Sequence, residues 1–221
     1  SINSQELKCN YEIIMVDDKS EDNTLQIIQK LSSLNNNTKV FYHDKNLGGG
    51  ATRNTAIKNS KGEYIFCLDS DDILAPNCLK KMLNKAKAES LDGVTIHESR
   101  KFIKNKSNII ATNTMGFLGQ IIPFNALFED GIFCGLYSTF LIRKEVHDLI
   151  GGYPEDHGFD TQHYAFRFLA NNFKAKASLG SIYYHRLSTS KPSYYIREYK
   201  SGRVNFNWHK ILVENLYLLS D

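Results

Sequence analysis

The sequence has few cysteines and few prolines, four of each in 221 residues, and a single tryptophan. The cysteines, Cys9, Cys67, Cys78 and Cys134, show no Cys-x-x-Cys spacing, and the seven histidines form no His-Glu-x-x-His motif. These absences argue against a zinc site and against a disulfide framework. We therefore expect reduced, mostly structural thiols, as in a cytoplasmic protein.

Long apolar runs and a strong charge are also missing. No run is long enough to span a bilayer, and the first residues lack the pattern of a signal peptide. A formal net charge of +3 is too small to indicate nucleic acid as a partner. The composition, 42% hydrophobic and 23% charged, is that of an ordinary globular protein, and 221 residues suffice for one α/β domain.

The first half of the chain alternates between strand-like and helix-like patterns. Such alternation predicts an α/β fold with a mostly parallel, Rossmann-like sheet and helices on both faces. The predicted strands are Tyr11–Val16, Lys39–His43, Tyr64–Leu68 and Gly93–His97, and the predicted helices are Leu25–Leu34, Ala51–Ser60 and Asn77–Glu89.

The second half is less regular. Arg100–Asn108 is basic and polar, which predicts an exposed hairpin or loop, and Ile109–Ile122 fits either a strand or a helix. Residues 1–190 are expected to form the main domain, with 191–221 as a helical extension packed on it. The segment Lys191–Trp208 is basic and aromatic, and its contact could be an acceptor, a partner protein or a membrane surface. The sequence does not decide among these three. The remaining predictions are strands at Tyr137–Ile142 and Ala175–His185, a short helix from Lys144, and helices at Asp160–Ala170 and from Tyr194.

The most informative segment follows the strand-like run that ends at Leu68, where Asp69, Ser70, Asp71 and Asp72 occur in succession. Ligands of open α/β sheets bind at the carboxyl ends of the strands. If the chain stays extended, Asp69 and Asp71 point to the same side. Two hard oxygen ligands of this kind suit Mg²⁺ or Mn²⁺ carrying a phosphate-bearing substrate. The ordinary alternative is a solvated acidic turn.

Two further polar segments follow predicted strands. Asp17 and Asp18 end the first strand, where a carboxylate either accepts hydrogen bonds from a nucleotide or caps the next helix. The glycine run 48–50 allows close approach to a ligand, and Arg53 is then a candidate for holding phosphate. The run is not a dinucleotide fingerprint, because Arg53 replaces the third glycine. A flexible turn before a surface helix is the alternative.

Two candidates lie in the second half. Asp160 is in the first turn of a predicted helix, where the helix dipole favours the ionised carboxylate. It can accept a proton from a hydroxyl or simply cap the helix. His185 and Arg186, with the polar run 188–191, follow the last predicted strand and either close over a diphosphate or form a solvated basic loop.

These segments occur together in one order, and in that order the chain resembles the inverting family 2 glycosyltransferases of GT-A fold over roughly residues 2–190. The matching pieces read YEIIMVDDKSEDNT at 11–24, NLGGGATRNTA at 46–56, GEYIFCLDSDD at 62–72, GGYPED at 151–156 and GFDTQHYAFR at 158–167.

The resemblance implies a metal-dependent inverting glycosyltransferase that uses Mn²⁺ or Mg²⁺ and a nucleotide-sugar donor, with a UDP-sugar expected first. It also implies a saccharide or lipid-linked acceptor and a role in surface polysaccharide or glycoconjugate synthesis. The setting expected is the cytoplasm, at the inner face of a membrane. The implied site consists of Asp160 as catalytic base, Asp69, Asp71 and Asp72 as metal ligands, and Asp17, Asp18, Arg53, Asp69, Ser70, His185 and Arg186 as donor-binding residues.

The chain departs from the family pattern in two places. The family opens with an extra strand and a Pro-x-Tyr-Asn-like turn, whereas this chain starts near the end of the following helix, at Ser1–Gln5. The segment before Asp160 reads Gly-Phe-Asp instead of the commoner Glu-Asp pair. The missing strand leaves open a rival function, a non-catalytic fragment or binding domain without donor binding. A second, independent rival is another nucleotide-using α/β enzyme, such as a nucleotidyltransferase that releases pyrophosphate.

Overall fold

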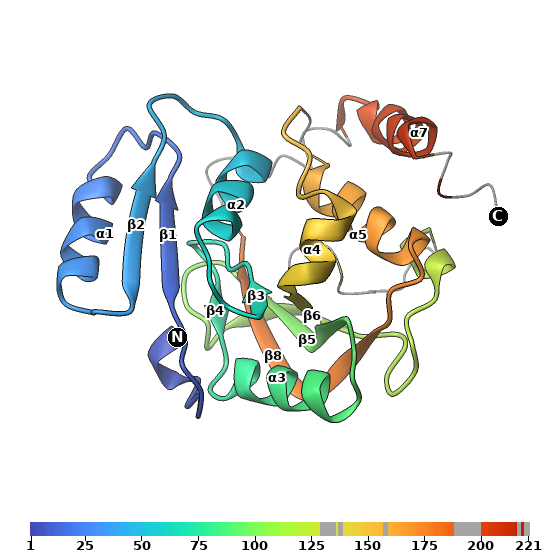
Figure 1. Ribbon diagram of the computed structural model, residues 1–221, viewed down its shortest axis with the longest axis horizontal. Helices are drawn as coiled ribbons and strands as arrows, with labels where there is room; N and C mark the ends of the chain where they lie inside the picture. The colour runs from blue at the N-terminus through green and yellow to red at the C-terminus, as the bar shows by residue number, and fades with distance from the viewer. Residues whose placement is uncertain (129–135, 137–138, 157–158, 188–199, 216–217, 219–221) are drawn as a thin grey trace.

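The computed structural model describes residues 1–128, 136, 139–156, 159–187, 200–215 and 218, and only the backbone of residues 203–206. The predicted donors at 188–191, part of the predicted strand Tyr137–Ile142 and Cys134 lie outside the described residues. Figure 1 shows a layered molecule in which a small sheet with helix α1 lies at one side and helix α7 lies at the other.

The strands form two sheets. β1 and β2 pair in parallel as a separate two-stranded sheet. The larger sheet has six strands in the order β3-β7-β5-β8-β4, with β6 paired to the outer part of β5. The bounds are β1 Ile13–Asp17, β2 Thr38–Tyr42, β3 Tyr64–Phe66, β4 Ile73–Leu74, β5 Gly93–Phe102, β6 Ile109–Thr114, β7 Phe140–Arg143 and β8 Ala175–Arg186.

The predicted α/β class is confirmed, but the prediction of a mostly parallel sheet is wrong. Of the strand pairs among the described residues, β1–β2 and β5–β8 are parallel, whereas β3–β7, β5–β7, β5–β6 and β4–β8 are antiparallel. The apolar pattern of a strand that is covered on both faces is the same in either direction. The sequence therefore located the strands without showing which way they run.

The helices lie close to their predicted positions. Helix α5 begins at Asp160 and ends at Ala170 as predicted, and the described part of the tail contains helix α7. The predicted helix start at Tyr194 lies outside the described residues. The apolar stripe of α1, by contrast, does not enter the core, because Ile27, Leu31 and Leu34 are 49%, 43% and 71% exposed. The bounds are α1 Thr24–Ser33, α2 Gly49–Lys58, α3 Cys78–Ala88, α4 Lys144–Ile150, α5 Asp160–Ala170 and α7 Arg203–Glu214, with 3-10 turns at Ile2–Ser4 and Phe124–Leu127.

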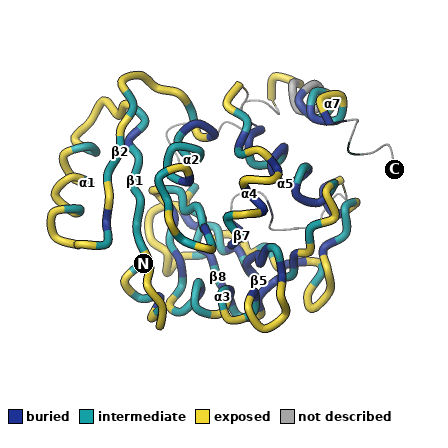
Figure 2. The backbone as a smooth tube through the Cα atoms, viewed as in Figure 1, coloured by how far each residue is buried: buried dark blue, intermediate teal, exposed yellow. Residues whose placement is uncertain are grey.

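The core lies on both faces of the larger sheet. On one face α5 contributes fully buried aromatic residues, Tyr164, Phe166 and Phe168, and Ile211 of α7 belongs to the same cluster. On the other face α3 packs Met82 and its neighbours against β5. Figure 2 shows the buried backbone concentrated in β5, β8 and α5. The aromatic anchors of α5 thus fix the helix that begins with Asp160.

Within the described residues, no helix combines the length and the apolar character that crossing a bilayer requires. The described cysteines are free thiols: Cys9 is exposed, Cys67 is half-buried and Cys78 is buried.

Candidate functional site

The centre of the site is an ion-pair bridge made by Arg53 of α2. Its Nη2 donates to Asp69 Oδ1 at 2.8 Å, and its Nη1 donates to Asp160 Oδ2 at 2.5 Å. Asp69 follows β3 and Asp160 begins α5, so the bridge joins three segments that are distant in sequence. Burial acts to lower the pKa of the Arg53 guanidinium, but the two carboxylates outweigh it and the pKa is raised. Arg53 is therefore a permanent cation between two acids.

Two glycines bring α2 close enough for this bridge. A Cβ atom on Gly50 would lie 2.0 Å from the carbonyl oxygen of Pro154 in the turn before α5. A Cβ atom on Gly49 would lie 2.9 Å from Arg53 Nη1 and 3.4 Å from Asp160 Oδ2. The glycine run therefore allows close contact between the helix and the turn, because glycine has no Cβ atom to keep the two backbones apart.

Asn54 ties the same helix to the same turn, and sequence reasoning missed it. Its Nδ2 donates to the Tyr153 carbonyl at 2.7 Å, and its Oδ1 accepts from the Tyr153 amide at 2.8 Å. The side-chain amide thus pairs with both backbone groups of Tyr153, as the backbone of a neighbouring strand would. The Tyr153 ring stacks on Tyr164 of α5 with centroids 4.0 Å apart, and the Arg53 guanidinium lies 5.6 Å from its centroid. The only signal in the sequence was the position of Asn54 directly after Arg53.

Asp18 fixes the loop that leads into α2. Its carboxylate accepts the amides of Leu47 at 2.8 Å and Gly48 at 2.7 Å, and it pairs with His43 Nδ1 at 2.7 Å. Burial pushes the pKa of Asp18 upward, but these hydrogen bonds outweigh it and lower the pKa. Asp17 is buried beside it and accepts the Ser20 amide at 3.1 Å. Neither residue caps α1, whose N-cap is Asn23.

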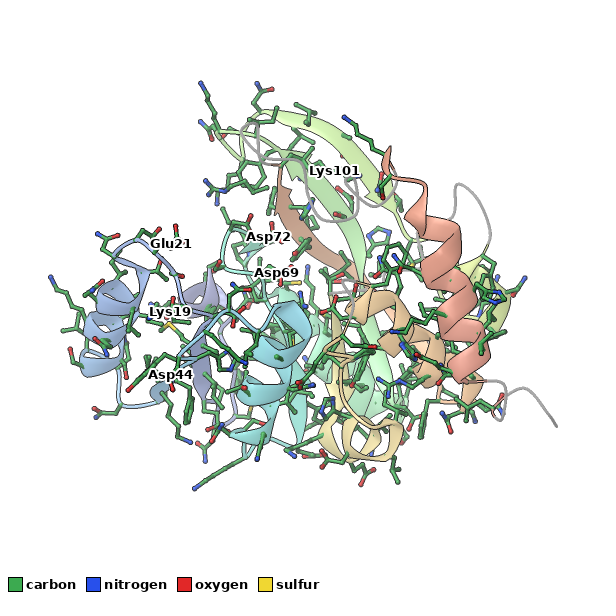
Figure 3. The ribbon with its side chains drawn as sticks, turned by 90° about the horizontal axis from the view of Figure 1, so that it is seen from above. Lys19, Glu21, Asp44, Asp69, Asp72 and Lys101 are labelled. Carbon is green, nitrogen blue, oxygen red and sulfur yellow. The ribbon has the colours of Figure 1, made fainter. Side chains whose placement is uncertain are left out.

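The segment Asp69 to Asp72 is a turn, so the expectation that Asp69 and Asp71 share a side through an extended chain does not apply. The Asp72 amide donates to the Asp69 carbonyl at 3.1 Å. Ser70 and Asp71 are exposed, and Asp69 keeps 41% of its side chain exposed. Although Asp71 is exposed, partial desolvation by the surrounding chain, followed by repulsion from Asp72, raises the pKa of its carboxyl group. Figure 3 shows Asp69 and Asp72 on this segment, between α2 and the end of the larger sheet.

Asp72 itself holds the end of β8. Its fully buried carboxylate accepts the Tyr183 hydroxyl, the Arg186 amide at 2.7 Å and His185 Nδ1 at 3.2 Å. Hydrogen bonding to Asp72 raises the pKa of His185. The Arg186 guanidinium donates to the Asp71 carbonyl at 3.0 Å. The structure thus brings both predicted β8 donors to the acidic turn, and the contacts of Asp72 favour a positioning role over its predicted metal ligation.

The remaining carboxylates fit a divalent cation in part. Among the described residues, no group of three or more His, Cys, Asp and Glu side chains is arranged to hold a metal ion. Asp69 and Asp71 nevertheless present exposed carboxylates on one short turn, and such hard oxygen ligands suit Mg²⁺ or Mn²⁺ that takes further ligands from substrate phosphates.

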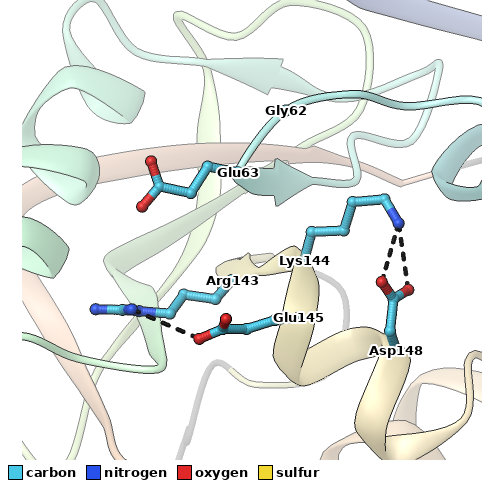
Figure 4. A pocket seen from close by; sticks show the side chains of 6 residues that line it. All are labelled: Gly62, Glu63, Arg143, Lys144, Glu145 and Asp148. Atoms are coloured by element: carbon cyan, nitrogen blue, oxygen red, sulfur yellow. Dashed lines mark hydrogen bonds and ion pairs between the residues drawn. The ribbon is translucent and has the colours of Figure 1, made fainter.

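A surface hollow of about 250 Å³ lies elsewhere, lined by Gly62, Glu63, Arg143, Lys144, Glu145 and Asp148 (Figure 4). It adjoins the start of β3, whereas Asp69 follows the end of that strand. Four of its charged side chains pair with one another, Lys144 with Asp148 and Arg143 with Glu145. The hollow is therefore separate from the Arg53 bridge.

Comparisons with known proteins match most of the chain to one family. The sequence model described as "Glycosyl transferase family 2" matches residues 1–151. The poly(ribitol-phosphate) beta-glucosyltransferase of Bacillus spizizenii is 42% identical over 92 residues, covering 41% of this chain and 14% of that enzyme. The poly(ribitol-phosphate) beta-N-acetylglucosaminyltransferase TarP of Staphylococcus aureus is 40% identical over 96 residues, covering 42% of this chain and 28% of that enzyme.

Among solved structures, residues 1–349 of S. aureus TarS in complex with UDP-GlcNAc give a TM-score of 0.68 at 23% identity. The match covers 86% of this chain and 54% of that chain. The two proteins therefore share a fold, and the present chain spans about half the length of the solved relative.

Proposed function

This chain belongs to glycosyl transferase family 2, and from that premise we propose that it transfers a sugar from a nucleotide-diphosphate sugar to an acceptor hydroxyl. The observation that carries the proposal is the bridge from Arg53 to Asp69 and Asp160. It brings a carboxylate from the end of β3 and another from the start of α5 to one cation. Sugar transfer can use such a pair, because one acid would hold a cation that neutralises the leaving diphosphate and the other would take the acceptor proton.

Asp160 is the proposed base. Its side chain is only 12% exposed, and the adjacent guanidinium favours the ionised carboxylate, which is the form that can accept a proton. It takes the acceptor proton on the face of the sugar opposite the leaving diphosphate, so the anomeric configuration is inverted. General-base assistance of this kind contributes roughly 10²–10⁴-fold in rate.

The donor is proposed to lie between the loop that Asp18 fixes and the end of β8 at Arg186. The loop fixed by Asp18 faces the nucleotide, and Arg53, His185 and Arg186 supply positive charge near the diphosphate. Asp69 and Asp71 would hold Mg²⁺ or Mn²⁺, which when bound neutralises charge on the leaving diphosphate. Asp72 keeps His185 and the end of β8 in place through its hydrogen bonds.

The relatives support a more specific proposal. S. aureus TarS has been crystallised with UDP and with UDP-GlcNAc, which supports a UDP-sugar as donor. The enzymes from B. spizizenii and S. aureus act on poly(ribitol-phosphate), as their names state, which supports an acceptor in surface polysaccharide synthesis.

Two measurements test the proposal. Calorimetric titration with UDP, with and without Mn²⁺, measures binding, and incubation with a panel of UDP-sugars measures the UDP that is released. We expect UDP to bind in the presence of Mn²⁺ and at least one donor to release UDP. Asp71→Ala should weaken the Mn²⁺-dependent binding by at least about ten-fold, whereas the control Asp148→Ala, in the separate hollow on α4, should leave it unchanged. Absence of UDP binding would contradict the proposal, and release of pyrophosphate would indicate nucleotidyl transfer.

A further inference from the structure

We infer that the hairpin of residues 98–114, called here the basic arm, binds the surface of an anionic lipid bilayer. The basic arm consists of the outer half of β5, the connecting turn 103–108 and β6, which among the described strands pairs with β5 alone. Figure 3 shows it extending beyond the turn of Asp69 and Asp72, with Lys101 labelled on it. The inference does not depend on the proposed function.

The basic arm holds all of the excess positive charge of the chain. It contains four Lys and Arg residues and one Glu, which give +3. Subtracting these from the totals of 27 basic and 24 acidic residues leaves 23 of each elsewhere, so the rest of the chain is neutral. The charge is therefore concentrated in one projecting hairpin, as expected for an electrostatic contact surface.

Most of this charge is not neutralised locally. Glu98 pairs with Arg100, but no carboxylate of the described residues pairs with Lys101, Lys104 or Lys106. Lys104 and Lys106 are exposed in the turn at the end of the basic arm. These lysines can therefore approach a layer of anionic headgroups without breaking an existing ion pair.

Apolar side chains at the same place favour a bilayer over a soluble polyanion. Ile103, the first residue of the turn, and Ile110 of β6 are 36% and 51% exposed. Together with Lys104, Asn105 and Asn108 they line a hollow of about 190 Å³. Exposed isoleucine next to lysine is stabilised where an apolar phase lies beneath a negative surface, because the lysine head stays at the headgroups while the isoleucine is buried. A soluble anionic chain would offer nothing to bury the isoleucines.

The basic arm is also continuous with the acidic turn. Lys101 is opposite His185 in the β5–β8 register, and His185 pairs with Asp72. Binding of the basic arm to a bilayer would therefore hold the acidic turn near the membrane, where an acceptor carried by a lipid would be presented.

Cosedimentation of the whole chain with vesicles tests the inference without any donor or acceptor. We expect binding to phosphatidylcholine vesicles that contain phosphatidylglycerol, weakening as salt is added, and little binding to phosphatidylcholine alone. Lys104→Glu/Lys106→Glu should lower the partition coefficient by at least roughly 25-fold, since each lysine near such a surface contributes about five-fold. Ile103→Ser/Ile110→Ser should lower it by roughly ten-fold with an unchanged salt dependence.

The matched control is Lys30→Glu/Lys87→Glu, which makes the same change of charge at exposed lysines on α1 and α3. Circular dichroism of every variant confirms folding before binding is compared. An equal loss in the control, or no binding by the unaltered chain, would overturn the inference. Undiminished vesicle binding by the isoleucine variant would also overturn the inference, because the basic arm would then recognise negative charge alone. In that case a soluble polyphosphate would compete with the vesicles equally well.

Discussion

Arg53 donates a 2.5 Å hydrogen bond to Asp160 although 107 residues separate them in sequence. The contact couples the middle of α2 to the start of α5, and the second hydrogen bond of Arg53 extends it to Asp69. Three of the residues predicted as functional therefore meet at one guanidinium.

Replacing the proposed base should separate catalysis from binding. Asp160→Asn keeps the size of the side chain and an oxygen that can accept from Arg53, but the amide cannot take a proton at neutral pH. We expect the rate of sugar transfer to fall by roughly 10²–10⁴-fold. UDP affinity measured by calorimetry should change by less than about three-fold. Equal losses of rate and affinity would argue that Asp160 acts in donor binding.

The two glycines of α2 should respond differently to the same substitution. Gly50→Ala places a Cβ 2.0 Å from a backbone oxygen that cannot move freely, so we expect a loss of about 1–3 kcal/mol in the free energy of unfolding. Gly49→Ala meets the flexible end of Arg53 at 2.9 Å, and Asp160 Oδ2 only at the ordinary contact distance of 3.4 Å. It should retain stability in urea denaturation while reducing transfer, because Arg53 is displaced from Asp160. Similar stability losses in both variants would contradict the close packing described for Gly50.

Asp18 should make the free energy of unfolding depend on pH in the acid range. Its pKa is lowered in the folded state, so its contribution is present above the ordinary aspartate pKa, about 3.9, and is lost as the pH falls through the folded value. Asp18→Ala leaves the amides of Leu47 and Gly48 without their acceptor and should cost about 2 kcal/mol at neutral pH. The exposed Asp44 of the same loop is the control, and Asp44→Ala should change the free energy of unfolding by less than about 0.5 kcal/mol.

His185 should remain protonated at a higher pH than an ordinary histidine. Its pKa is raised by the hydrogen bond to Asp72, so the stabilisation is complete below about pH 6.5 and is lost as the pH rises through the folded pKa. Asp72→Asn should bring the pKa, followed by NMR of the imidazole protons, back toward the ordinary value. The decline of stability above neutral pH should then flatten. An unchanged histidine titration in Asp72→Asn would refute the assigned pair.

Much of the fold could be predicted because local patterns specify it. Helix α5 begins at the predicted Asp160, and β8 extends one residue beyond its predicted end. The direction of β7 could not be predicted, since its apolar residues fit a parallel and an antiparallel strand equally well. The apolar stripe of α1 marked a helix correctly but gave no information about its exposure.

The sequence by itself determined which residues are candidates for the chemistry: acids that follow strands, glycines before a helix and a cation one turn into it. It could do so because composition and spacing are local properties. Only the tertiary structure decided how these residues are used. The turn at Asp69–Asp72 separates an exposed Asp71 from a buried Asp72, and Arg53 reaches two acids from distant segments. Those outcomes depend on packing between segments far apart in the chain, which no local pattern encodes.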